Sequence, residues 1–263
     1  MEYLTWNIDP VLISIGGLRV HWYGLLFATG IILGYQLVKW IYQREAKNSQ
    51  HLDRLLFYLL GGTLIGARLG HTLLYDPGYY LSHPLKIVAI WEGGLASHGG
   101  AVGALIGLYL YQRTTGESYR WLLDRVAIAA ALAGTFIRIG NLFNSEIVGL
   151  PTTVPWAIIF SRVDTLPRHP TQLYEALAYA VIFVLLLLSY KKWGKQWAEG
   201  ALFGAYLVLV FTSRFLIELV KSKQESYTLE SWMSTGQLLS LPFIVAGVIL
   251  IILAVKKQGR VGG

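Results

Sequence analysis

The chain has 263 residues, of which 54% are hydrophobic and only 14% are charged. A soluble domain usually carries about 25% charged residues, which it needs to cover its surface. The composition therefore excludes an ordinary soluble enzyme and a disordered protein, and it predicts a polytopic membrane protein surrounded by lipid. The sequence has no cysteine, so disulfides, thiolate metal sites and an enzyme thiol as nucleophile are excluded as well.

Seven apolar stretches are long enough to cross a bilayer as helices, which takes about 20 residues each. In chain order they cover Val20–Trp40, Leu55–Tyr75, Leu85–Tyr111, Trp121–Gly140, Leu173–Tyr190, Ala198–Val220 and Gly236–Val255. The sequence therefore predicts an all-α fold, a bundle of seven transmembrane helices. In the second and third stretches, glycines recur at every fourth position, which favours close packing against neighbouring helices over direct contact with a ligand. These glycines are Gly62, Gly66, Gly70, Gly99, Gly103 and Gly107.

The Lys and Arg residues outside these stretches predict the orientation of the chain. The whole chain has 22 Lys and Arg residues, of which 13 lie in every second segment and only 5 lie in the segments that alternate with them. The other four are Arg19, Arg68, Arg138 and Arg214. The richer segments are 39–54, 111–125, 191–199 and 256–263, and the poorer ones are 1–17, 76–86, 141–170 and 221–235. Because the richer segments stay in the cytoplasm, we expect the N-terminus outside and the C-terminus in the cytoplasm. Topology thus accounts for the net charge of +7, and no nucleic-acid partner is expected.

Segment 141–171 is longer than the other connections and differs from them in amino-acid composition. It contains four prolines and an apolar run, Val154–Phe160, that predicts a strand. We expect it to form a small extracytoplasmic cap. No internal repeat is visible, so a single membrane domain over 1–263, with the cap inserted at about 141–171, accounts for the chain. Residues 1–17 contain no Lys or Arg and so lack the basic region of a cleaved signal peptide.

A charged side chain inside a bilayer costs at least ~2.5 kcal/mol, so each one retained there needs a function or a partner. The ionisable residues toward the outer ends of the stretches are His21, Arg68, His71, Glu92, His98, Arg138, Glu146 and Glu218, and Arg214 lies deeper in its stretch. We expect them to converge on one polar cavity open to the outer leaflet. Two or three arginines in such a cavity form a strong site for an anionic group, most naturally a phosphate. His98, beside two glycines, can be approached closely by a substrate and can exchange a proton near neutral pH.

Several of these residues also have a structural alternative. Arg214 and Glu218 are four residues apart, and they can neutralise each other as an i,i+4 pair instead of binding substrate. Arg68 can donate to backbone carbonyls or extend to the interface, and Tyr23 suits an aromatic belt at the membrane boundary. The run that starts at Arg138 is different, because a cation, two amides and a carboxylate within nine residues favour a binding site.

Motifs of several well-known catalytic sites do not occur in the sequence. There is no His-Glu-x-x-His, no Gly-x-Ser-x-Gly elbow, no Walker A loop and no dinucleotide fingerprint. The six histidines are never three or four residues apart, so a metal site is not expected, and neither is a cofactor.

Eight motifs occur in one order along the seven stretches. They are His21-Trp-Tyr-Gly, Gly66-Ala-Arg-Leu-Gly, Trp91-Glu-Gly-Gly, Ser97-His-Gly-Gly, Arg138-Ile-Gly-Asn-Leu-Phe-Asn-Ser-Glu-Ile-Val-Gly149, Arg168-His-Pro-Thr-Gln-Leu-Tyr-Glu175, Arg214-Phe-Leu-Ile-Glu218 and Ser234-Thr-Gly-Gln-Leu-Leu-Ser240. A single motif of this kind is weak, but eight in register are specific. Together they make the chain resemble the bacterial prolipoprotein diacylglyceryl transferases over nearly its whole length.

This resemblance implies a reaction within the membrane. Phosphatidylglycerol donates its diacylglyceryl group, and the thiol of the lipobox cysteine in a prolipoprotein signal peptide attacks the carbon bonded to phosphate. A thioether forms and glycerol phosphate leaves, in the first step of lipoprotein maturation. The resemblance also implies the bacterial cytoplasmic (inner) membrane as the location, membrane lipid as the surroundings, and no cofactor.

The resemblance further implies roles for individual residues. Arg138 and Arg214 hold the phosphate and stabilise the charge that builds as the bond breaks, and His98 either is the base for the thiol or positions lipid. The other residues implied to line the substrate site are Tyr23, Arg68, Asn141, Asn144, Glu146, Gly149 and Glu218. Gly149 and the cap are implied to shape the entrance for the signal peptide.

Two other classes of protein remain open. A transporter for an anion also suits buried arginines and glycine-rich helices, although no inverted repeat is visible and the charges gather on one side. A lipid-binding protein without catalysis needs the arginines but not His98, so an alanine at His98 distinguishes it from an enzyme.

Overall fold

The structure is a computed structural model that describes residues 2–194, 197–222 and 233–261, with side chains up to residue 257. Lys195 and Lys223, which contribute to the charge pattern, lie outside the described residues. The chain forms two compact units, each with its own packing. Unit 1 comprises Met1–Val38 and Asp124–Gly263, and unit 2 comprises Lys39–Leu123.

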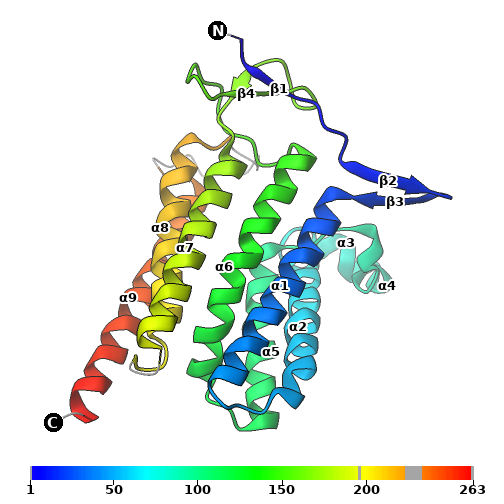
Figure 1. The fold of residues 1–263 in the computed structure, drawn as a ribbon. Helices are drawn as coiled ribbons and strands as arrows, with labels where there is room; N and C mark the ends of the chain where they lie inside the picture. The colour runs from blue at the N-terminus through cyan, green and yellow to red at the C-terminus, as the bar shows by residue number, and fades with distance from the viewer. Residues whose placement is uncertain (1, 195–196, 223–232, 262–263) are drawn as a thin grey trace. The chain divides into compact units, whose positions relative to one another are not determined.

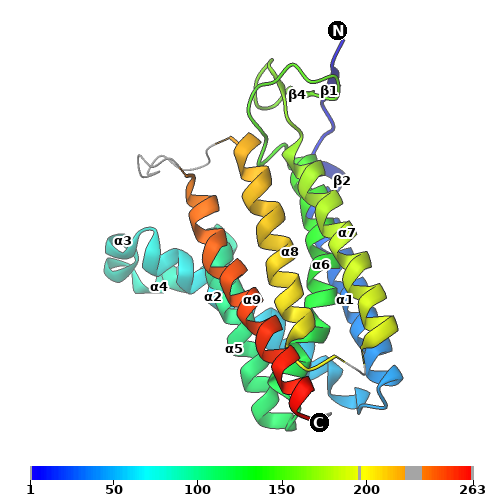
Figure 2. The same ribbon diagram turned by 90° about the vertical axis from the view of Figure 1, so that its left-hand side faces the viewer.

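Five helices among the described residues are long and apolar enough to cross a membrane, and they lie wholly or mostly in unit 1 (Figures 1 and 2). They are α1 (Trp22–Arg44), α6 (Tyr119–Asn144), α7 (Thr171–Trp193), α8 (Ala201–Ile217, continued by the 3₁₀ turn η3, Glu218–Val220) and α9 (Thr235–Val261). In Figure 2, α8 runs beside both α7 and α9. The prediction of a mainly helical, polytopic membrane protein is confirmed.

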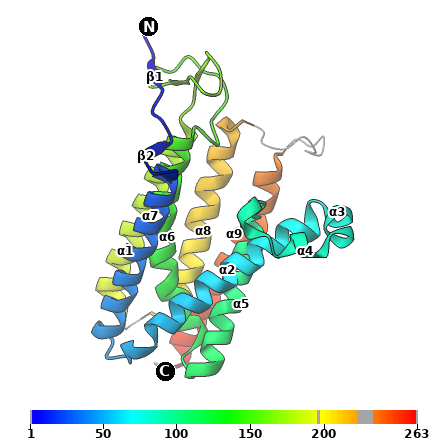
Figure 3. The same ribbon diagram turned by 90° about the vertical axis from the view of Figure 1, so that its right-hand side faces the viewer.

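Unit 2 is built on two helices, α2 (Leu52–Leu74) and α5 (Ser97–Thr115), which pack along each other (Figure 3). Its shorter elements are η1 (Ser49–His51), α3 (Pro77–Ser82), α4 (Pro84–Ile87) and η2 (Ile90–Glu92). The two long helices correspond to the second and third predicted stretches. They are not among the five candidate spans, because glycines and polar side chains reduce their apolar content. The count of seven membrane spans is therefore not confirmed.

The third predicted stretch, Leu85–Tyr111, is not one continuous helix. The long helix of this stretch, α5, begins only at Ser97, because a Gly-Gly pair before it adopts left-handed backbone. The φ angles are +85° at Gly93 and +70° at Gly94. Left-handed residues cannot continue a right-handed helix, so the preceding part of the stretch folds into short turns.

Among the described residues, two small sheets accompany the helices, so the fold is mainly but not only α. β2 (Val11–Ile15) and β3 (Leu18–His21) form an antiparallel hairpin. Its turn residues, Gly16 and Gly17, have positive φ, as a two-residue hairpin turn of this kind requires. The hairpin takes up Val20, so the first transmembrane helix begins two residues later than predicted.

The second sheet joins the N-terminal residues to the segment predicted as a cap (Figure 1). Its strands, in spatial order, are β1 (Leu4–Trp6), β4 (Ile158–Phe160) and β5 (Pro167–Arg168), with β1 parallel and β5 antiparallel to β4. The strand predicted in Val154–Phe160 is thus present in its last three residues. Phe160 packs with Leu142, at the end of α6, in a small apolar core. The sheet therefore braces the turn after α6, where several predicted site residues lie.

The glycine spacing in unit 2 produces close helix packing, as predicted. A Cβ on Gly62 or Gly66 of α2 would overlap the backbone of Gly103 or Gly99 of α5. The two backbones therefore meet directly along this interface, and no larger side chain fits between them.

Candidate functional site

Arg138 on α6 lies against Glu175 on α7. Its Nε atom is 2.9 Å from Glu175 Oε2, an ion pair in which the N–H is not aligned as a hydrogen bond. The Glu175 side chain is 1% exposed and the Arg138 side chain 15%. The guanidinium carbon also lies 5.9 Å from the centre of the Tyr179 ring. The carboxylate and the ring hold Arg138 in one placement and leave part of its guanidinium accessible.

Three polar residues that follow Arg138 continue this network. Arg138 Nη1 donates to Asn141 Oδ1 at 3.2 Å, and Asn141 Nδ2 donates to Glu146 Oε2 at 3.0 Å. Asn144 Nδ2 donates to the other carboxylate oxygen, Glu146 Oε1, at 2.9 Å. From α7, Gln172 Nε2 donates to the Glu146 backbone carbonyl at 2.6 Å. One cation, two amides and one carboxylate are thus linked in a single chain of hydrogen bonds.

The turn that presents Glu146 has an uncommon backbone. Ser145 and Ile147 have φ angles of +54° and +58°, in the left-handed region that residues other than glycine rarely adopt. Arg162 donates to Ser145 Oγ at 3.1 Å, and Thr171 Oγ1 donates to the Ile147 carbonyl at 2.6 Å. Strained backbone that several partners hold in place is typical of functional sites.

Glu175 also binds a second cation, Lys221, which directly follows η3. Lys221 Nζ donates to Glu175 Oε1 at 3.1 Å and lies 3.9 Å from Glu218 Oε2. Lys221 is buried, and this burial lowers the pKa of its amine, while the Glu175 carboxylate opposes the change. Glu175 thus bridges two cations, Arg138 through one oxygen and Lys221 through the other.

Arg214 and Glu218 do not form the i,i+4 pair that their spacing allows. The Glu218 carboxylate lies against the first turn of α9, where a Cβ on Gly236 would be 2.5 Å away, and its ionic partner is Lys221. The half-buried Arg214 guanidinium has neither a hydrogen bond nor an ion pair with any residue that the structure describes. A cation on an apolar helix without such a partner is available to an anionic ligand.

Tyr23 and Gly149 both lie at closely packed contacts within unit 1. Tyr23 lies in the first turn of α1 and packs on α6, where a Cβ on Gly140 would be 2.8 Å from the tyrosine ring. The Gly149 N–H donates to the His169 carbonyl at 2.9 Å, and a Cβ on Gly149 would be 2.5 Å from His169 Cβ. The Gly149 carbonyl accepts from Arg168 Nη1 at 3.0 Å. Gly149 is therefore a junction of backbone segments that leaves no space for a side chain.

Arg68 and His98 belong to unit 2. Arg68 is 4% exposed and donates to backbone carbonyls at the end of α4 and in the connection between α4 and α5, which is one of the structural alternatives for this residue. His98 lies in the first turn of α5, and its side chain is exposed. Within unit 1, direct contacts join four of the predicted site residues, namely Arg138, Asn141, Asn144 and Glu146.

Two charged residues of this cluster, Glu175 and Lys221, have no role predicted from the sequence. For Glu175 a signal is available, since a carboxylate inside the apolar stretch Leu173–Tyr190 is costly to bury without a partner. For Lys221 the signal is weaker, because a lysine just past the end of an apolar stretch usually extends to water.

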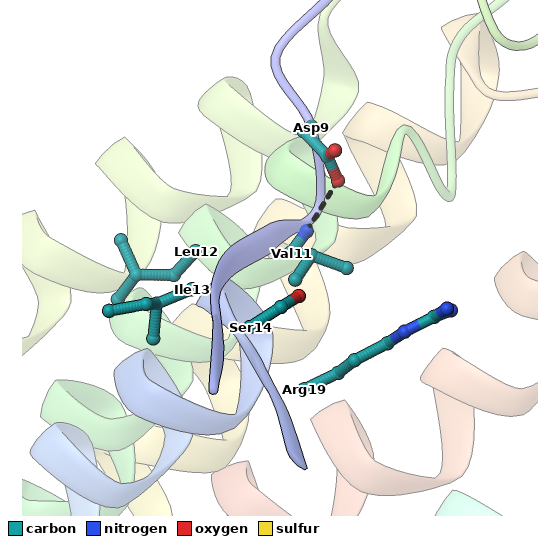
Figure 4. Close-up of a pocket in the computed structure, with 6 residues that line it drawn as sticks. All are labelled: Asp9, Val11, Leu12, Ile13, Ser14 and Arg19. Carbon is teal, nitrogen blue, oxygen red and sulfur yellow. Dashed lines mark hydrogen bonds between the residues drawn. The ribbon is translucent and has the colours of Figure 1, made fainter. Parts of the chain in front are cut away.

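An open hollow on the β2–β3 hairpin is separate from these residues. It is lined by Asp9, Val11, Leu12, Ile13, Ser14 and Arg19 (Figure 4). The Val11 N–H donates to the Asp9 carboxylate at 2.7 Å. This hydrogen bond is the dashed line in Figure 4. None of the predicted site residues lines the hollow. In the part of the chain that the structure describes, no group of His, Asp and Glu side chains is arranged to hold a metal ion.

The chain matches known proteins over nearly its full length. A family model described as prolipoprotein diacylglyceryl transferase matches residues 10–253. A phosphatidylglycerol–prolipoprotein diacylglyceryl transferase from Tolumonas auensis is 52% identical, over 98% of this chain and 100% of its own length. Proteins of the same name from Chloroherpeton thalassium and Porphyromonas gingivalis are 47% and 46% identical, each over 97% of this chain and 96% of its own length. With its candidate membrane spans, the chain is an integral membrane protein that belongs to the prolipoprotein diacylglyceryl transferase family.

Proposed function

We propose that this protein transfers the diacylglyceryl group of phosphatidylglycerol to the thiol of the lipobox cysteine of a prolipoprotein, the first step of lipoprotein maturation. The names of its relatives describe the transfer of a diacylglyceryl group from phosphatidylglycerol to a prolipoprotein. The observation that carries the proposal is the buried network around Arg138, which offers an oriented and partly accessible guanidinium in a member of this family.

The reaction exchanges one bond for another at a glyceryl carbon. The cysteine sulfur attacks the carbon, the carbon–oxygen bond to phosphate breaks, and the carbon–sulfur bond of a thioether forms. Glycerol phosphate leaves with the electron pair of the broken bond, and the thiol proton passes to a base. The leaving phosphate gains negative charge as the bond breaks, so the site has to supply positive charge there.

Arg138 and Arg214 are proposed to hold this phosphate. Glu175 and Asn141 orient the Arg138 guanidinium before substrate arrives, so little freedom is lost on binding. Arg214 lacks an ionic partner among the described side chains, and a phosphate would supply the missing negative charge. Guanidinium groups suit this task, because their N–H donors match the spacing of phosphate oxygens.

His98 is proposed to act at the thiol, either as its base or as a group that positions lipid. Its exposed imidazole is followed by Gly99 and Gly100, so no bulky neighbour in the chain blocks a substrate from that side. The reference pKa of a thiol is about 8.5 and that of imidazole is about 6.5, a difference small enough for proton transfer at neutral pH.

Other residues are proposed to surround the headgroup and the entrance. Those proposed to line the site are Tyr23, Asn141, Asn144, Glu146 and Glu218. Gly149, together with the cap at 141–171, is proposed to shape the entrance for the signal peptide. Its crowded backbone junction supports this role, since the path of the chain there depends on the missing side chain.

We further propose that the chain is one membrane domain of seven spans in the bacterial cytoplasmic (inner) membrane. The N-terminus would lie outside and the C-terminus in the cytoplasm, with the site toward the outer leaflet. The uneven distribution of Lys and Arg supports this orientation. α2 and α5 would complete the set of seven, and their direct backbone contact supports a shared place in the membrane.

The transferase proposal is tested with the purified protein in detergent, phosphatidylglycerol and a peptide that carries a lipobox cysteine. Release of glycerol phosphate and the mass of the peptide are followed together. We expect both products from the wild type, and turnover at least about 10²–10³-fold slower in Arg138→Ala, because a donor to the leaving phosphate is lost. Arg113→Ala removes an exposed arginine at the end of α5 and should keep full activity.

Two outcomes would favour the other classes of protein. If neither product forms while phosphatidylglycerol still binds, the protein is a lipid-binding protein without catalysis. If an anion crosses the membrane of proteoliposomes without any precursor peptide, the protein is a transporter.

A further inference from the structure

Arg68 of α2 donates hydrogen bonds to four backbone carbonyls. Its Nε donates to Ile87 at 2.9 Å and its Nη2 to Lys86 at 2.5 Å. Its Nη1 donates to Gly94 at 3.2 Å and also to Gly93. An arginine has five N–H groups, so a single one remains. Arg68 therefore cannot offer a phosphate the two parallel N–H groups of a bidentate contact.

The four carbonyls belong to the segment 86–96, which leads into α5. This segment is irregular, because it passes from the end of α4 through η2 to the left-handed Gly93 and Gly94. Carbonyls outside helices and strands need donors from elsewhere, above all within a membrane protein. Gly93 and Gly94 carry carbonyls of this kind, and Lys86 and Ile87 are the last two residues of α4. One buried side chain, Arg68, donates to all four carbonyls and thereby fixes the path of the segment.

Neighbouring residues of α2 hold the start of α5 in the same way. The Ala96 N–H donates to the Ala67 carbonyl at 2.9 Å. A Cβ on Gly99 would overlap the Gly66 carbonyl, so the first turn of α5 touches the α2 backbone directly. This first turn carries His98. The placement of its imidazole therefore depends on how the segment before it is held.

We propose that Arg68 is a positioning residue for His98, and that it acts through the backbone of segment 86–96 instead of binding phosphate. The inference rests on the role of His98 in the proposed transfer. It replaces the role in substrate binding that the family resemblance implies for Arg68. A displacement of about 1 Å in a reacting group can slow a reaction by about 10²-fold, so a loosened segment should reduce turnover strongly.

Arg68→Lys and Arg68→Ala test this role. Lysine keeps the charge, but its compact ammonium cannot serve four carbonyls that lie around a planar guanidinium. We expect both variants to lower kcat by about 10²-fold and to leave the KM for phosphatidylglycerol nearly unchanged. A phosphate-binding role predicts a raised KM that lysine partly restores, and this result would overturn the inference.

A cycle with His98→Ala separates positioning from any independent contribution. In the His98→Ala background, Arg68→Lys should cause little further loss, because no imidazole remains to be positioned. If the two losses simply add, Arg68 does not act through His98.

Gly94→Ala disturbs the same segment while Arg68 is kept. A Cβ on Gly94 would be 2.5 Å from the His71 ring and 2.9 Å from Arg68 Nη1, and the φ of +70° disfavours alanine. The segment must therefore shift, and we expect the same fall in kcat with little change in KM. This variant carries the test if Arg68→Ala fails to fold.

Amide hydrogen exchange measures the segment without any need for activity. Exchange between residues 90 and 99 should become faster in Arg68→Lys. It should stay at the wild-type rate in Arg113→Lys, which changes an exposed arginine on α5. Unchanged exchange in Arg68→Lys would overturn the inference, whereas a wild type without transferase activity would contradict the proposed function instead.

Discussion

Glu175 forms ion pairs with two cations of the site at once. It contacts Arg138 through one carboxylate oxygen and Lys221 through the other, and its side chain is 1% exposed. Lys221 has a second carboxylate nearby, Glu218, but at the longer distance of 3.9 Å. Removal of one member of a buried ion pair leaves an uncompensated charge, which is more costly than replacing both members.

The variant Glu175→Gln should therefore lower the free energy of unfolding by about 3–5 kcal/mol and reduce turnover, because Arg138 loses its anchor. Thermal unfolding in detergent and the transferase assay measure the two effects. The double variant Glu175→Gln/Lys221→Met removes one uncompensated cation and should be more stable than Glu175→Gln alone. A double variant that is less stable would contradict this assignment of charges.

Local spacing predicts some site residues well and others poorly. Arg138, Asn141 and Glu146 can be predicted as a group, because the end of one helix and the next turn bring them together. For Arg214 and Glu218, the i,i+4 spacing is misleading. α8 ends before Glu218 and continues as a 3₁₀ turn, which has about 3.0 residues per turn instead of about 3.6 and so turns the carboxylate to another direction.

Among the secondary-structure elements, the α2–α5 pair shows how glycine spacing acts. The two backbones touch along the sides of the helices that carry the recurring glycines, and a larger side chain there would push the helices apart. Gly61 is the direct neighbour of Gly62 but faces another direction, and a Cβ added there would have no atom of the described residues within 4 Å.

We expect Gly103→Ala to lower the thermal midpoint and the yield of folded protein, because a Cβ there would overlap the Gly62 carbonyl. Gly61→Ala is the matched control and should leave both quantities near the wild-type values, since its Cβ meets open space. Equal behaviour of the two variants in the same unfolding experiment would show that the contact between the helices does not limit stability.

Helix starts are only partly readable from the sequence. The start of α9 is a capping box, in which Ser234 Oγ accepts from the Gln237 N–H at 3.2 Å and Gln237 Oε1 accepts from the Ser234 N–H at 2.9 Å. Here prediction and structure differ by one residue. The start of α5 is harder to predict, because Gly93 and Gly94 can either continue a helix or adopt positive φ, and apolar content does not distinguish these conformations.

For the whole molecule, the absence of cysteine makes the proposed orientation easy to test, because each introduced cysteine is then the only thiol. Ser14→Cys on β2 should react with a membrane-impermeant maleimide added to intact spheroplasts. Gln50→Cys, in segment 39–54, which the proposed orientation places in the cytoplasm, should react only after the membrane is opened. Both positions are exposed, so burial does not limit either reaction. The reverse pattern would contradict the orientation.

The sequence by itself determines that the chain is an apolar, mainly helical membrane protein. It also determines that Lys and Arg gather in every second connecting segment, and that glycines recur at every fourth residue in two of the apolar stretches. These are properties of consecutive residues, so they can be read without knowing any long-range contact. Only the tertiary structure decides that Arg68 serves carbonyls before α5, that Glu175 joins Arg138 to Lys221, and that β1 pairs with β4. Each of these contacts joins residues far apart in the chain, and many alternative partners would satisfy the same charge or hydrogen bond until packing selects one.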